Sequence, residues 1–116
     1  MVKIYGIKNC DTMKKAFDWL KANGVAYEFH DYRVEGINAA LVRDWCGQVG
    51  WEKVLNKAST TFKDLPEADK ADLDEEKAIA LMTREPTMIK RPALVVGDRV
   101  TNGFKPVVYE QIFARR

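Results

Sequence analysis

Residues 2–30, VKIYGIKNCDTMKKAFDWLKANGVAYEFH, contain the pattern that decides the fold. The run from Val2 to Ile7 is β-prone, and the apolar residues that follow it recur at helical spacing. They are Met13, Ala16, Phe17 and Leu20. Asn23-Gly24 is typical of a helix end, and residues 25–30 then alternate apolar with polar as a strand does. We therefore predict a βαβ unit, which in one sheet is parallel and right-handed.

The middle of the chain, about residues 37–86, is predicted to be helical. Asn38 can cap a helix whose apolar stripe includes Trp45 and Cys46. Ser59 to Thr61 reads as a polar break, and a second helical stretch runs from about Asp72 until Pro86 ends it.

The last third predicts a hairpin and a helix. Arg91-Pro92 opens the β-branched run Ala93–Val96, Gly97-Asp98 can turn the chain, and residues 99–101 return antiparallel. Pro106 suits the first position of a helix. Its expected apolar side consists of Val107, Val108, Ile112 and Phe113. The predicted fold is α/β in a single domain, residues 1–116, with a helical insert between βαβ and ββα halves.

Composition excludes several functional classes. The formal net charge of +2 is too small to indicate a nucleic-acid surface. No apolar run is long enough to span a membrane, and the first residues do not resemble a secretory signal, so we expect a cytoplasmic protein. Two cysteines and one histidine provide neither a disulfide scaffold nor a usual zinc site. We expect no metal and no tightly bound cofactor.

Cys10 is the candidate nucleophile. A cysteine between a first strand and a first helix meets the free N–H groups and positive dipole end of that helix, which favour the thiolate. Lys8 and Lys14 can add positive potential, and Asn9 is one of the polar neighbours that indicate an exposed turn. The alternative is that Cys10 is a small buried hydrophobe, a frequent fate of free cysteine.

The other thiol and the histidine are weaker candidates. Met13 stands three residues after Cys10, so there is no CxxC pair and an external thiol must complete the reaction. Cys46 could resolve an oxidised Cys10, but its place on an apolar stripe favours packing. His30 lies on the strand face opposite Tyr27 and Phe29, and we interpret it as a surface residue outside the site.

Three segments resemble the ArsC/Spx family, and within it the short YffB-like branch. They are IYGIKNCDTMKKAFDWL (4–20), TREPTMIKRPALV (83–95) and VTNGFKPVVYEQI (100–112). The resemblance implies a thioredoxin-like, glutaredoxin-like fold: a mixed four-stranded sheet with a helical insertion. It also implies that Pro92 is cis and faces the nucleophile.

The anion-binding pattern of the family is altered here. In the arsenate reductases that the sequence resembles, arginines surround the cysteine, and Arg91 matches one of them. Lys105 stands at a second such position, which keeps the charge but loses the bidentate fork. Asn56 aligns with a third. Those enzymes also carry a histidine four residues before the cysteine, where this sequence has Gly6.

These departures favour glutathione over arsenate. We expect Lys8, Asn9, Arg91, Pro92 and Lys105 to bind glutathione as a co-substrate, and Cys10 to reduce a small-molecule or protein disulfide. Two alternatives stay open: arsenate reduction coupled to glutathione or glutaredoxin, and a regulator that binds RNA polymerase, as the Spx proteins resembled here do. We expect no nucleic-acid or membrane partner, and a monomer.

Overall fold

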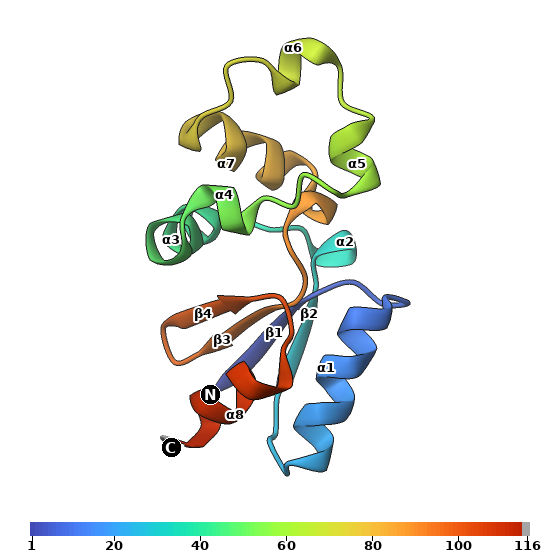
Figure 1. The fold of residues 1–116 in the computed structure, drawn as a ribbon, viewed down its shortest axis with the longest axis vertical. Helices are drawn as coiled ribbons and strands as arrows, with labels where there is room; N and C mark the ends of the chain where they lie inside the picture. The colour runs from blue at the N-terminus through green and yellow to red at the C-terminus, as the bar shows by residue number, and fades with distance from the viewer. Residues whose placement is uncertain (115–116) are drawn as a thin grey trace.

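The computed structural model describes residues 1–114 as a four-stranded sheet with helices on both faces (Figure 1). Its elements, in chain order, are β1 (Val2–Gly6), α1 (Asp11–Ala22), β2 (Glu28–Asp31), α2 (Tyr32–Glu35), α3 (Ala39–Val49), α4 (Trp51–Val54), α5 (Thr60–Lys63), α6 (Glu67–Lys70), α7 (Glu75–Arg84), the 3-10 turn η1 (Pro86–Met88), β3 (Ala93–Val96), β4 (Arg99–Asn102) and α8 (Pro106–Ala114). The strand order is β2-β1-β3-β4, with β1 and β2 parallel and the other pairs antiparallel. The predicted mixed sheet with a helical insertion is confirmed.

The alternation of side chains along β1 explains the two covered faces. Val2 and Ile4 are buried in a cluster with residues of α1 and α8, whereas Tyr5 belongs to a second cluster built from the helical insert. Successive residues of a strand point to opposite faces, so an apolar run such as β1 is buried on both sides. In Figure 1 the insert lies above the sheet, whereas α1 runs beside the strands and α8 lies near their lower end.

Packing and the side chain of Gln48 attach the insert to the sheet. Asn38 caps α3 as predicted, since its Oδ1 accepts a hydrogen bond of 2.8 Å from the Leu41 N–H. Gln48, near the end of α3, accepts from the Val100 N–H of the edge strand β4 at 2.9 Å and donates to the Asp98 carbonyl at 2.8 Å. These bonds occupy part of an edge that would otherwise be open to pairing with another chain.

Several predicted boundaries are corrected. The polar break at residues 59–61 begins a helix, because Ser59 Oγ accepts from the Phe62 N–H and caps α5. α7 starts at Glu75 rather than at about Asp72, since Asp74 is its capping residue. The second strand is also shorter than the alternation indicated and starts at Glu28.

Ile112 and Phe113 of the last helix are partly buried against the core as predicted, but the fully buried residue of this helix is one that was not predicted. Tyr109 is fully buried and contacts Trp19 and Phe104 edge to face, whereas Val107 is 57% exposed. The apolar pattern did not include tyrosine, although an aromatic ring with a polar tip can be buried in a core. Within residues 1–114, no helix is both long and apolar enough to cross a lipid bilayer.

Candidate active site

Cys10 is the N-cap residue of α1. Its backbone is extended (φ −120°, ψ 127°), and its carbonyl accepts the first helical bond from Lys14 N–H at 2.9 Å. Asn9 precedes it with a left-handed φ of 58°, a conformation that asparagine adopts more readily than most residues. This turn directs the chain from β1 into α1 and leaves Cys10 half-buried. The predicted strand-turn-helix placement of the thiol is therefore observed.

The helix terminus gives the thiol a favourable electrostatic setting. No side chain caps the first N–H groups of α1, and Cys10 itself makes no side-chain capping bond. Those N–H groups and the helix dipole place partial positive charge at the N-terminus, where a thiolate is stabilised. Because Cys10 is half-buried rather than enclosed, a sulfur-containing substrate can reach it.

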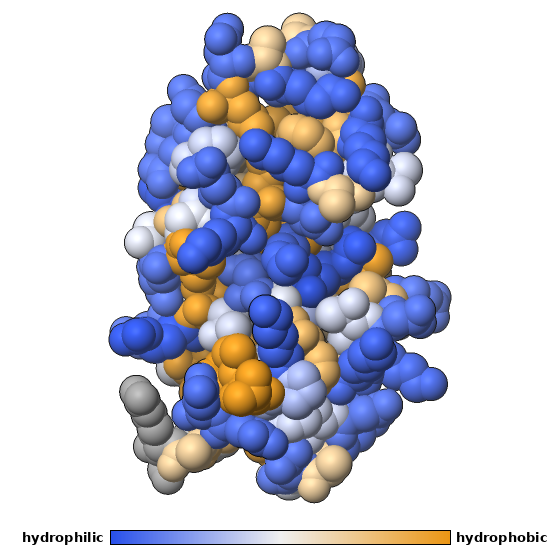
Figure 2. Space-filling model, in the orientation of Figure 1, coloured by the Kyte–Doolittle hydropathy of each residue, from blue (hydrophilic) through white to orange (hydrophobic). Residues whose placement is uncertain are grey.

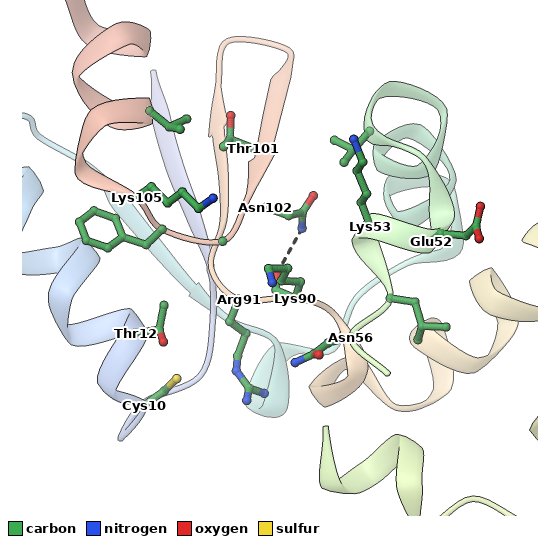
Figure 3. A pocket seen from close by; sticks show the side chains of 15 residues that line it. Cys10, Thr12, Glu52, Lys53, Asn56, Lys90, Arg91, Thr101, Asn102 and Lys105 are labelled. Carbon is green, nitrogen blue, oxygen red and sulfur yellow. Dashed lines mark hydrogen bonds between the residues drawn. The ribbon is translucent and has the colours of Figure 1, made fainter. Parts of the chain in front are cut away.

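Cys10 opens into a pocket of about 740 Å³ that lies between the sheet half and the insert. Figure 3 shows Cys10 and Thr12 at one end of the pocket and Lys53 of α4 at another, with Lys90, Arg91 and Asn102 between them. The polar surface across the middle of the molecule in Figure 2 lies over the same junction of sheet and insert. The charged residues of the lining are Glu52, Lys53, Lys90, Arg91 and Lys105.

Arg91 is held in the pocket by its own segment. Its Nη1 donates a hydrogen bond of 3.1 Å to the Thr87 carbonyl. The adjoining backbone is fixed as well, because Lys90 N–H donates to the Val54 carbonyl at 2.8 Å and Asn102 Nδ2 donates to the Lys90 carbonyl at 3.2 Å. Four cations and one carboxylate make the pocket suitable for an anionic ligand.

The predicted site residues are not all in this lining. Cys10, Arg91 and Lys105 line one pocket, as does Asn56. Pro92 is absent from the lining: it is buried, it follows a cis peptide bond as the resemblance implied, and its carbonyl accepts from Gly103 N–H at 2.9 Å. Its predicted contact with the ligand stays a prediction. Lys8 and Asn9 are exposed beside Cys10 but outside the pocket lining, so their part in binding stays a prediction.

Two cations of the pocket were missed by sequence reasoning. Lys90 adjoins Arg91, so its position next to a candidate residue was a signal that could have been used. Lys53 belongs to the insert, and no local pattern shows which side of the insert faces the thiol. Both residues are exposed and line the pocket.

The interpretation of His30 as a surface residue is corrected. Its side chain is 26% exposed, and its ring centroid lies 4.9 Å from that of Tyr5. Nε2 is 2.9 Å from the Gly36 carbonyl, and Nδ1 is 3.8 Å from the Glu35 carboxylate. These contacts join the end of β2 to α2. His30 is absent from the pocket lining, in agreement with its exclusion from the site.

Cys46 is structurally distinct from Cys10. It is 3% exposed on α3, and burial raises the pKa of its thiol to about 11. A thiol in that setting stays protonated at neutral pH and is a poor nucleophile. The expected packing role of Cys46 is confirmed. Among residues 1–114, no three His, Cys, Asp or Glu side chains gather where they could hold a metal ion.

The sequence profile of the ArsC family matches residues 5–112. The chain belongs to the ArsC family. A solved YffB protein is 56% identical, with a TM-score of 0.93 over 96% of this chain and 97% of that one. An arsenate reductase (ArsC) related protein from Brucella melitensis is 48% identical, with a TM-score of 0.76 over 97% and 93% of the two chains.

A third relative of this ArsC family member is a regulator by name. The global transcriptional regulator Spx of Lactiplantibacillus plantarum is 23% identical over 106 residues, which are 90% of this chain and 80% of that protein. The chain is therefore similar both to a protein described as related to arsenate reductase and to a protein named as a regulator.

Proposed function

We propose that this protein is a glutathione-dependent thiol–disulfide reductase that uses Cys10 as its single nucleophile. The observation that carries the proposal is the half-buried Cys10 at the N-terminus of α1, which opens into a cationic pocket. Cys46 is buried and unreactive, so the pocket has no second thiol to resolve the reaction. An external thiol must do so, and glutathione is anionic and matches the charge of the pocket.

The reaction balances with two glutathione molecules. The Cys10 thiolate attacks the glutathione sulfur of a mixed disulfide, forms an enzyme–glutathione disulfide, and releases the client thiolate, which takes a proton from water. A second glutathione thiolate then attacks this sulfur. Glutathione disulfide leaves and the Cys10 thiolate is restored. Of these two glutathione molecules, one comes from the mixed disulfide and one enters as the free thiol. The sulfur of the entering glutathione is oxidised from thiol to disulfide while the client sulfur is reduced from disulfide to thiol, and Cys10 is unchanged overall.

The cations of the pocket account for the choice of co-substrate. Glutathione carries two carboxylates, and the cations that would bind them in this proposal are Arg91 and Lys105, which both line the pocket. Lys8 and Asn9 adjoin Cys10 in sequence and would contact glutathione outside the pocket lining. Pro92 would contact the sulfur-bearing end of the ligand. These assignments are part of the proposal.

Arsenate reduction is the second candidate, supported by the relative described as an arsenate reductase (ArsC) related protein. Three positions disfavour it here: Lys105 and Asn56 replace planar forks of donors, and Gly6 stands where the resembled reductases have a histidine. Arsenate-dependent oxidation of glutathione above background at modest enzyme concentration would reverse the preference for disulfides.

A regulatory role is supported by the Spx relative. Spx proteins typically use a CxxC switch, and Met13 occupies the second position of that motif. Met13 is only 1% exposed in the core beneath α1, so this position contributes packing rather than redox chemistry. Stable co-purification with RNA polymerase would favour the regulator.

The cellular setting follows from the chemistry proposed. A glutathione-dependent enzyme with two free cysteines suits the reducing cytoplasm. We also propose a monomer, since Gln48 occupies part of the β4 edge. Analytical ultracentrifugation at micromolar concentration checks this assignment, and a dimer would contradict it.

The proposed activity is tested by turnover of a small glutathione mixed disulfide, with glutathione disulfide formation measured. We expect Cys10→Ser to abolish turnover and Cys46→Ala to keep most of it. Both variants must show the far-ultraviolet circular dichroism of the wild type. Turnover retained by Cys10→Ser would contradict the proposal.

A further inference from the structure

Tyr32 places a buried hydroxyl behind the active site. It is the first residue of α2 and directly follows Asp31, which pairs with Gly6 at the end of β1. The two parallel strands therefore deliver Tyr32 and the Cys10 loop to the same end of the sheet. Tyr32 is 1% exposed, and its hydroxyl donates to the Ile89 carbonyl at 3.4 Å.

That carbonyl belongs to the segment that presents Arg91. Ile89 lies two residues before Arg91, and η1, which precedes it, packs against α2. The guanidinium itself is bonded on one side to the Thr87 carbonyl at 3.1 Å. Residues 87–91 are thus attached to the body of the protein at the backbone, and Tyr32 reaches them from the sheet half.

The phenol is also electrostatically linked to the site. Burial raises the pKa of Tyr32, while the positive charge and hydrogen-bonding capacity of Arg91 act in the opposite direction and a charge on Cys10 raises it further. The phenol stays protonated, so it can donate to the Ile89 carbonyl.

We propose that Tyr32 is a positioning residue whose hydroxyl, through the Ile89 carbonyl, holds the segment that presents the Arg91 guanidinium at the Cys10 end of the pocket, an inference that rests on the proposed function. The guanidinium has five donors, and Thr87 satisfies only part of them. The remaining donors then face the thiolate and the anionic substrate.

The test compares two alkylating probes of similar size, neutral iodoacetamide and anionic iodoacetate, on Cys10 in a Cys46→Ala background. The ratio of the iodoacetate rate to the iodoacetamide rate reports positive charge held beside the sulfur. We expect Tyr32→Phe to lower this ratio about twofold to tenfold, the effect of one hydrogen bond. It should also move the pH midpoint of iodoacetamide alkylation upward.

Tyr109→Phe is the matched control. Tyr109 is the other fully buried tyrosine near a core helix, and its hydroxyl has no hydrogen-bond partner within the described residues. Tyr109→Phe should leave the ratio of alkylation rates and the pH midpoint of iodoacetamide alkylation unchanged. Equal effects of the two tyrosine variants would overturn the proposal, because they would show a general response of the core.

The route through Arg91 is tested by combining substitutions. Arg91→Ala alone should lower the rate ratio, and Tyr32→Phe should add nothing in that background. An unchanged ratio in Arg91→Ala, or an independent effect of Tyr32→Phe, would overturn the positioning role. Alkylation needs no glutathione, so a rate ratio that depends on Tyr32 in a protein without turnover would support the positioning role and reject the proposed function.

Discussion

The side chain of Met13 occupies the space above Gly6. A Cβ atom at Gly6 would collide with Sδ and Cε of Met13, which is buried between α1 and the sheet. Gly6 is the position of the histidine in the resembled arsenate reductases, and Met13 is the position of the second cysteine in Spx proteins. The two positions that would support arsenate reduction or an Spx-type redox switch are therefore in direct contact in this protein.

This contact predicts strong coupling between the two residues. Gly6→Ala should destabilise the protein by about 1–3 kcal/mol through overpacking, and Met13→Ala by about 2–5 kcal/mol through a cavity. In the double variant the new methyl enters the vacated space. Urea unfolding should show that the double variant loses less unfolding free energy than the sum of the losses of the two single variants, by at least about 0.5 kcal/mol. Additive losses would show that the two side chains do not compete for space.

The buried thiol of Cys46 predicts a loss of stability in alkali. Its pKa in the folded protein is about 11, raised mainly by burial, whereas an unfolded cysteine titrates near about 8.5. The unfolded chain therefore loses this proton first. The stability that the protonated Cys46 thiol contributes is fully present below about pH 8.5 and is lost as the pH rises toward about 11.

The measurement is the urea midpoint of wild type and Cys46→Ala between pH 8 and about pH 10.5, where folding is still reversible. We expect the wild-type midpoint to fall more steeply with pH. Tyr32 and Tyr109 titrate in both proteins and cancel in the comparison. Parallel curves would mean that Cys46 is not protected by the fold.

Lys105 predicts a selective effect on glutathione binding. It is exposed in the pocket lining, so its ion pair with a carboxylate is worth only about 0.5–1 kcal/mol. Lys105→Ala should raise the KM for glutathione about twofold to fivefold and leave kcat nearly unchanged. Lys15→Ala, an exposed lysine of α1 outside the pocket, is the control. A fall in kcat with constant KM would place Lys105 in the chemical step instead.

Lys8→Ala tests whether glutathione binding depends on closeness to Cys10 in sequence or on membership of the pocket lining. Lys8 adjoins the Cys10 loop but is absent from the pocket lining. If pocket geometry governs binding, its substitution changes the KM for glutathione less than Lys105→Ala does. A larger effect at Lys8 would move the glutathione site to the outer side of Cys10.

The sequence predicted those helices and turns that depend on residues close together in the chain. The helical spacing from Met13 to Leu20 and the turn at Gly97-Asp98 both correspond to observed elements. The misassigned stretches depend on long-range packing. Ser59 caps a helix too short to show periodicity, and Tyr109 replaces Val107 in the core because of its aromatic neighbours.

The residues of the candidate site likewise fall into those that a local sequence pattern indicates and those that only the fold brings to the site. Cys10 could be found from its strand-turn-helix setting, and Arg91 from its segment before the hairpin. Tyr32 could not, because 57 residues separate it from the carbonyl to which it donates. Lys53 was missed for the same reason: the fold of the insert, rather than any nearby motif, brings it to the pocket.

The most direct test of glutathione chemistry at Cys10 is the intact mass of the protein after exposure to glutathione disulfide and then to excess glutathione. We predict one glutathione adduct, located on Cys10 by peptide mapping, retained in Cys46→Ala, absent in Cys10→Ser, and removed by glutathione. No adduct on Cys10, or an adduct that glutathione does not remove, would contradict a single-thiol reductase.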